Sequence, residues 1–223
     1  CLVADEIHLI NDSGRGPTLE VTLSKFREIN PTIQIIGLSA TVSNSEEIAE
    51  WLNATLVQSD FRPVPLRRGI AIDKEIEWED GEKKSIGLSG VEGIATDNLP
   101  EQCLVFVGTR RAAEAQARNL SRLIGKKLNS EDVKRLKTYS DKIKQGADEV
   151  TSVDSNLSKL IAKGVSYHHA GLTNRHRQII ESAFRDKALK ALCATPTLAA
   201  GVNLPAKRVI IRDLSRWESS FQS

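Results

Sequence analysis

The stretch LVADEIHLI, residues 2–10, is a short apolar run interrupted by the adjacent carboxylates of Asp5 and Glu6 and then by His8. Residues 2–4 predict a buried strand, and acidic side chains are rarely buried beside one unless they are paired or hold a metal ion. Ligands of open α/β sheets bind at the carboxyl ends of the strands, where this pair would lie. The pair therefore indicates either a site for magnesium and a nucleotide polyphosphate or simply a turn that favours negative charge.

Apolar runs of strand length alternate with segments of helical spacing along the chain. The strand-like runs are CLVAD, IQIIGLSA, PLRRGIAI, CLVFVGT, GVSYHHA, KALCAT and RVIIRD, and helices are predicted over 17–29, 44–52, 110–124 and 174–184. Buried strands that alternate with helices are typical of an α/β fold whose parallel sheets are flanked by helices on both faces.

Two further segments carry local predictions. Ser43 or Asn44, followed by Glu46 or Glu47, predicts a capping box at the start of the second helix. Residues 125–160 are polar and compatible with helix, which indicates an exposed helical excursion or a partly disordered insert.

A domain boundary is predicted within SDFRPVPLRRG, residues 59–69, because Pro63 and Pro65 favour an extended connection that is poor in hydrogen bonds. Residues 1–65 would hold two strands and two helices, too few to close a sheet, as in the tail end of an α/β domain. Residues 66–223 would hold a more complete sheet.

Composition limits the class of protein. The 223 residues are 40% hydrophobic and 27% charged, as in ordinary globular proteins, and the net charge of +2 does not by itself require nucleic acid. No apolar run is long enough to span a membrane. Cys103 and Cys193 lie in apolar runs and are predicted to be buried free thiols in a reducing cytoplasm. The chain contains no methionine and is expected to be a fragment of a longer protein.

Three other strand ends carry candidate site residues. Ser39, Ala40 and Thr41 follow the second apolar run, Thr109 and Arg110 lie where a strand becomes a helix, and Thr195 precedes a very short predicted helix that begins at Pro196. Their hydroxyl groups and free N–H groups could bind phosphate. Taken alone, the first two sites are better explained as ordinary helix caps, whereas the short helix after Thr195 favours a ligand.

His168 and His169 are neighbours on a predicted strand, so their side chains should point to opposite faces of the sheet. They cannot chelate one metal ion together. A mixture of buried hydrogen bonding and surface contact is expected instead.

Taken in order, DEIH, SAT, VFVGTRR and ATPTLAAGVNLPAKRVIIRD resemble motifs II, III, IV and V of superfamily-two DExH helicases. RGPTLE, RPVPL and HHAGL are similar to the superkiller-like branch and, within it, to the archaeal DNA helicases that act at stalled forks. The resemblance covers essentially the whole chain. It implies two RecA-like domains that face each other: residues 1–65 would be the C-terminal portion of the first, and residues 66–223 most of the second, truncated before motif VI.

The resemblance also implies roles for single residues. Asp5, Glu6 and His8 would be catalytic, and Asp5 and Glu6 would hold Mg largely through water. Ser39, Ala40 and Thr41 would couple the ATP site to domain closure, and Gly201 and Asn203 would approach ATP from the second domain. Nucleic acid would be bound by Thr109, Arg110, His169 and Thr195.

The activity that the resemblance implies is ATP-dependent 3′–5′ movement along single-stranded or forked DNA, in the cytoplasm and associated with the nucleoid. RNA as the substrate, or an inactive nucleic-acid-binding scaffold, are the alternatives. The remaining domains of a parent helicase would be partners. No GxxxxGK[ST] phosphate loop and no arginine-rich motif VI is found in the sequence, so the isolated chain is expected to lack useful ATPase activity.

Overall fold

The computed structural model describes residues 1–39, 44–59, 61–62, 64–145, 150–198 and 204–213. The chain forms two compact units, Cys1–Leu66 and Arg67–Ser223, which are described separately below. No helix of the described residues is both long and apolar enough to span a membrane.

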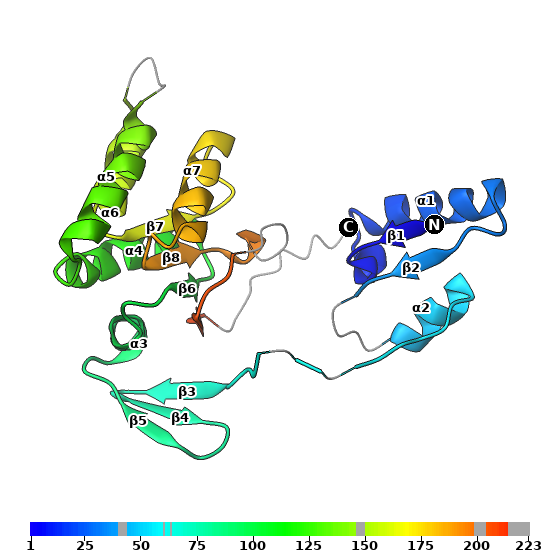
Figure 1. Ribbon diagram of the computed structural model, residues 1–223, viewed down its shortest axis with the longest axis horizontal. Helices are drawn as coiled ribbons and strands as arrows, with labels where there is room; N and C mark the ends of the chain where they lie inside the picture. The colour runs from blue at the N-terminus through cyan, green and yellow to red at the C-terminus, as the bar shows by residue number, and fades with distance from the viewer. Residues whose placement is uncertain (40–43, 60, 63, 146–149, 199–203, 214–223) are drawn as a thin grey trace, which may run out of the picture. The chain divides into compact units, whose positions relative to one another are not determined.

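The first unit is built on two parallel strands, β1 (Leu2–Ala4) and β2 (Ile35–Gly37), with Val3 opposite Ile36 (Figure 1). Between them lie a 3₁₀ turn, η1 (Ile7–Asn11), and the helix α1 (Gly16–Ile29), and α2 (Ser45–Leu52) follows β2. The core of this unit is small and consists of Ala4, Ile7, Leu23 and Leu52.

One local prediction for this unit is wrong, and a second is wrong for the one of its two candidate caps that the structure describes. The first strand is not fully buried: Val3 is 57% exposed, on a sheet that has two strands among the described residues of this unit. Asn44 is the N-cap of α2, but its side chain makes no capping hydrogen bond, and its backbone lacks the extended conformation that a capping side chain requires. Ser43, the other candidate cap, lies outside the described residues.

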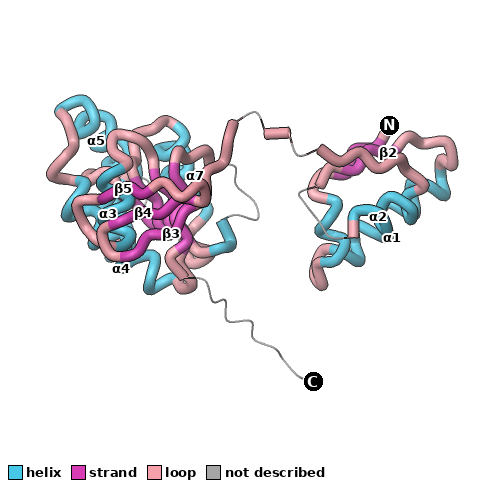
Figure 2. Tube along the Cα trace, turned by 90° about the horizontal axis from the view of Figure 1, so that it is seen from below, coloured by secondary structure: helices cyan, strands magenta, loops and turns pink. Residues whose placement is uncertain are grey.

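The second unit begins with an antiparallel meander of three strands, β3 (Gly69–Ile72), β4 (Glu75–Trp78) and β5 (Lys83–Ser85), followed by α3 (Gly90–Asp97) (Figure 2). The sequence predicts a strand at GIAI but not its antiparallel partners. The overlooked signal is the Asp80–Gly81 pair between β4 and β5, where Gly81 adopts a φ of +81° in a hairpin turn.

A four-stranded parallel sheet forms the centre of the second unit, in the order β7 (Val165–His168), β8 (Ala191–Ala194), β6 (Cys103–Phe106) and β9 (Arg208–Ile211). Three connections of this sheet carry helices: α4 (Arg110–Ile124), α7 (Asn174–Arg185) and the short η2 (Pro196–Leu198). All residues of β7 and β8 are buried. The predicted α/β fold with parallel sheets flanked by helices is therefore confirmed.

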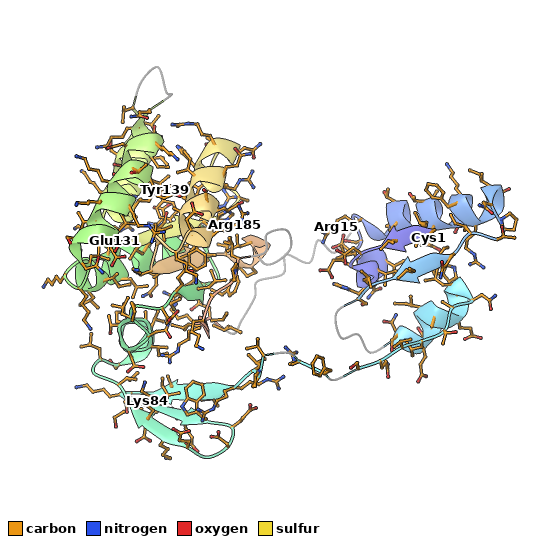
Figure 3. The ribbon with its side chains drawn as sticks, viewed as in Figure 1. Cys1, Arg15, Lys84, Glu131, Tyr139 and Arg185 are labelled. Atoms are coloured by element: carbon orange, nitrogen blue, oxygen red, sulfur yellow. The ribbon has the colours of Figure 1, made fainter. Side chains whose placement is uncertain are left out.

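Residues 125–160 differ from the prediction. They contain α5 (Ser130–Lys144) and α6 (Ser152–Ile161), which pack against each other and carry fully buried side chains at Leu136, Ile143, Leu157 and Ile161. Figure 3 labels Tyr139 of α5 and Arg185 of α7; the Tyr139 hydroxyl bonds to Asp186, just beyond α7. The two helices are part of the core and not an exposed excursion. Each has one apolar stripe, and this stripe is buried against the rest of the unit although the other side of the helix is polar.

The two cysteines of the parallel sheet, Cys103 and Cys193, are buried free thiols, as predicted. Burial raises the pKa of Cys103 to about 12 and raises that of Cys193 well above its usual value. Both thiols are therefore protonated and serve as packing groups.

Candidate functional site

The acidic pair lies directly after β1. Glu6 adopts a left-handed backbone conformation, with a φ of 53°, and its N–H donates to Asp5 Oδ1 at 2.9 Å. On either side of this turn, the Leu38 N–H donates to the Ala4 carbonyl and the Ile7 N–H donates to the Leu38 carbonyl, each at 2.9 Å. These bonds attach the acidic turn to the carboxyl end of β2 and leave both carboxylates exposed.

His8 connects the acidic pair to the segment after β2. Its Nδ1 atom lies 3.3 Å from Glu6 Oε2 and 3.5 Å from Ser39 Oγ. The structure thus brings Asp5, Glu6, His8 and Ser39 together at one edge of the two-stranded sheet. Ala40 and Thr41, the other residues predicted for this place, lie outside the described residues.

The oxygens of the acidic pair suit a hard cation. Within the described part of the chain, neither Asp5 nor Glu6 pairs with a lysine or arginine, and no group of three or more His, Cys, Asp and Glu side chains could enclose a metal ion. Magnesium fits such a pair, because it prefers oxygen ligands, keeps several waters and is commonly held by one or two carboxylates and a phosphate.

A surface depression of about 390 Å³ adjoins Asp5 and is otherwise lined by Leu9, Gly14 and the first half of α1. Arg15, which is labelled in Figure 3, forms part of its wall. It pairs with Asp12, whose pKa is lowered by this side chain and by the Arg15 and Gly14 N–H groups. A Cβ atom at Gly16 would lie 2.1 Å from the Ile10 carbonyl oxygen, so only glycine permits this approach of α1 to η1.

In the second unit, the carboxyl ends of the parallel strands gather the other candidate residues. Thr109 follows β6 and caps α4, where its Oγ1 accepts the Ala112 N–H at 3.1 Å. Thr109 and Arg110 are exposed. Thr195 follows β8, is buried, and donates its N–H to the His168 carbonyl at 3.2 Å. The start of α4 and the end of β8 are joined through the Val107 N–H, which donates to the Ala194 carbonyl.

The two adjacent histidines at the end of β7 point to different helices, as predicted from strand geometry. His168 Nε2 lies 3.0 Å from Glu181 Oε1 of α7, and His169 Nε2 lies 3.4 Å from Glu114 Oε1 of α4. Burial lowers the pKa of both rings despite these carboxylates. Both rings are buried, so the surface contact that was expected for one of them is not found.

Thr109, Arg110, His169 and Thr195 therefore share one edge of the parallel sheet. Gly201 and Asn203, the residues predicted to approach ATP, lie outside the described residues.

Sequence reasoning missed several residues that build this edge. Asp213 follows β9, and its Oδ2 accepts the Gly108 N–H at 2.7 Å, which holds the turn before Thr109. Asp213 is fixed by two hydrogen bonds from Arg212, which lower its pKa. The rule that singled out Asp5, a carboxylate directly after an apolar strand, would also have found Asp213. Glu114 could have been found from its position four residues before Arg118, with which it pairs.

Sequence comparisons agree with this arrangement. Residues 1–48 match the family described as DEAD/DEAH box helicase, and residues 144–222 match the helicase conserved C-terminal domain. The chain belongs to the superfamily-two helicases.

Three individual relatives of the chain are helicases with one name. The chain is similar to proteins named ATP-dependent DNA helicase Hel308 from Methanocella arvoryzae, at 43% identity over 100% of the chain, and from Thermoplasma acidophilum, at 46% over 98%. A third relative with this name, from Methanococcus vannielii, is 44% identical over 98% of the chain. The chain spans 30% of the length of each of these relatives.

Proposed function

We propose that the chain is part of a longer ATP-dependent helicase that moves 3′ to 5′ along single-stranded DNA at stalled forks or repair intermediates, in the cytoplasm and in association with the nucleoid. The observation that carries the proposal is the meeting of Asp5, Glu6, His8 and Ser39 at the carboxyl ends of two parallel strands. Four separate sequence motifs of this family, two of them in this cluster, lie in the expected order, and relatives named as DNA helicases cover the whole chain.

At the acidic pair, Asp5 would hold magnesium through its water shell, and Glu6 would orient the attacking water and accept its proton. When bound, magnesium neutralises charge on the ATP phosphates. His8 contacts both Glu6 and Ser39, so it would link the hydrolytic residues to the Ser39–Ala40–Thr41 segment. Gly201 and Asn203 would approach the nucleotide from the second RecA-like domain.

The edge of the parallel sheet in the second unit would hold backbone phosphates. The first N–H groups of α4 and the exposed Arg110 offer a positive site at a helix start, where anions bind readily. Such contacts position a strand without reading its sequence, as translocation requires. Residues 1–65 would then belong to the first RecA-like domain and residues 66–223 to the second.

The acidic pair is tested by Glu6→Gln in the full-length helicase. The change keeps the shape of the side chain but removes the proton acceptor, so we expect ATP binding to persist and steady-state turnover to fall by about 10²-fold or more. Glu28→Gln, at an exposed position of α1, is the matched control and should turn over normally. Turnover of Glu6→Gln at the wild-type rate would refute the assignment.

RNA is the second candidate substrate, because the superkiller-like branch that this sequence resembles includes RNA helicases. Stimulation of ATP turnover in the full-length protein by DNA and RNA strands of matched sequence separates the two. We expect the DNA strand to stimulate more strongly; stronger stimulation by RNA would replace the proposed substrate. Turnover that neither strand stimulates would favour a scaffold role instead.

A further inference from the structure

Glu114 is a negative side chain within the surface that is proposed to hold phosphates. It lies one helical turn after Arg110 on α4, and about a third of its side chain is exposed. A carboxylate at this place repels a phosphate, so its presence calls for a compensating role.

The contacts of Glu114 indicate that role. Its Oε1 atom lies 3.4 Å from His169 Nε2, and its Oε2 atom lies 3.6 Å from Arg118 Nη1. The Gly171 N–H donates to His169 Nδ1 at 3.1 Å, so the proton of the neutral ring is on Nε2. Within the described residues Nε2 is buried and forms no hydrogen bond, and its contact with the Glu114 carboxylate is electrostatic. The ring is buried and stacks on Tyr167, with centroids 5.3 Å apart. Glu114, Tyr167 and the Gly171 N–H together determine the orientation of His169.

Arg110 lies against the turn that His169 holds. A Cβ atom at Gly171 would lie 3.2 Å from Arg110 Nη1 and 3.1 Å from His169 Nδ1. In the described ranges of the chain, the Arg110 guanidinium forms no hydrogen bond or ion pair, whereas Arg118, on the same helix, pairs with Glu114. The His169–Gly171 turn is therefore the neighbour against which the Arg110 head group lies.

We propose that Glu114 and His169 are positioning residues for Arg110. Glu114 orients the His169 ring, the ring fixes the Gly171 turn, and the turn supports the Arg110 guanidinium where a backbone phosphate is held. His169 then acts through Arg110 and does not itself contact the strand. The inference rests on the proposed function, in which Arg110 binds a phosphate.

The sign of the effect of Glu114→Gln on DNA affinity tests this inference. If Glu114 acted only through its charge, its removal would strengthen binding of a single-stranded oligonucleotide to the full-length protein. If it positions Arg110, the variant binds more weakly, by about fivefold, which lies in the range for coupled neighbours. Glu101→Gln, an exposed position before β6, makes the same change of charge and should not weaken binding. Tighter binding by Glu114→Gln would overturn the proposal.

A double-mutant cycle with Arg110→Ala separates positioning from a general loss of structure. Arg110→Ala alone should weaken binding and lower the slope of log affinity against log salt by about 0.7, the value for one contact on a single strand. In the Arg110→Ala background, Glu114→Gln and His169→Gln should have no further weakening effect. Equal weakening in both backgrounds would show that Glu114 does not act through Arg110. An Arg110→Ala protein that binds normally would instead refute phosphate binding by Arg110 itself.

Discussion

At the scale of single residues, Asp154 joins two helices of the second unit. One carboxylate oxygen accepts the Thr151 N–H at 2.8 Å and the Thr151 hydroxyl at 2.6 Å, and the other lies 2.7 Å from His176 Nε2 of α7. The Thr151 hydroxyl is the largest cause of the lowering of the Asp154 pKa to about 2, against the opposing effect of burial, and the Thr151 N–H and His176 lower it further.

Asp154→Ala should therefore destabilise the chain by about 2–4 kcal/mol, because it removes one half of the capping box of α6 and leaves a buried imidazole without its partner. Asp154→Asn should cost less, since an amide oxygen can still accept the Thr151 N–H. Urea unfolding near neutral pH measures the free energy of unfolding of both variants. A decrease of less than about 0.5 kcal/mol for Asp154→Ala would contradict this account. The wild-type contribution of Asp154 should be present above its ordinary pKa of 3.8 and should disappear as the pH falls toward 2.

The acidic pair also shows what sequence can predict about single residues. Asp5 and Glu6 are adjacent to a strand, so their place at its carboxyl end followed from the sequence alone. The contact of His8 with Ser39 joins residues 31 positions apart and depends on the pairing of Val3 with Ile36, which the sequence does not specify. The same holds for Asp213 and Gly108, which are 105 positions apart.

At the scale of elements, β7 ends at the buried His168, and the buried His169 follows it directly. His168 faces Glu181 of α7, and His169 faces Glu114 and Arg110 of α4. Burial lowers the pKa of both rings below their ordinary value of 6.5, so the unfolded chain binds protons on these residues at a higher pH than the folded chain does.

The contribution of these two histidines to the free energy of unfolding should consequently be constant above about pH 7. It should fall as the pH is lowered through 6.5. Urea unfolding between pH 7.5 and 5 measures this dependence. His168→Gln, which cannot take up the proton, should reduce the slope of the free energy of unfolding against pH. A slope that is unchanged in His168→Gln and in His169→Gln would contradict the assignment.

The helices and strands differ in how well the sequence predicted them. The helix predicted over 110–124 was observed with the same bounds, because Thr109 gives a clear cap and the apolar positions of α4 repeat every three or four residues. α5 and α6 were underestimated, because their apolar residues are few and lie among lysines, serines and aspartates. The antiparallel partners of β3 were overlooked because β5 has no apolar residue and β4 is rich in charged residues. These charges pair across the strands, such as Lys83 with Glu75 and Glu77.

At the scale of the whole molecule, the polar candidate residues of each unit lie at the carboxyl ends of its parallel strands. In the first unit these are Asp5, Glu6 and Ser39, and in the second unit Thr109, His169 and Thr195. This recurrence is a property of parallel sheets. It is why the α/β class, and the position of these residues at strand ends, could be predicted from the order of the motifs. The supporting contacts could not, because they depend on which strands are neighbours.

The central claim is that the Asp5–Glu6 pair holds a divalent cation together with ATP. Manganese, observed by electron paramagnetic resonance, can replace magnesium in the full-length protein with ATP present. We expect Asp5→Asn to weaken manganese binding by about tenfold or more, the effect of about 1.4 kcal/mol, while affinity for single-stranded DNA measured without nucleotide stays unchanged. Manganese affinity in Asp5→Asn equal to that of the wild type would contradict the account.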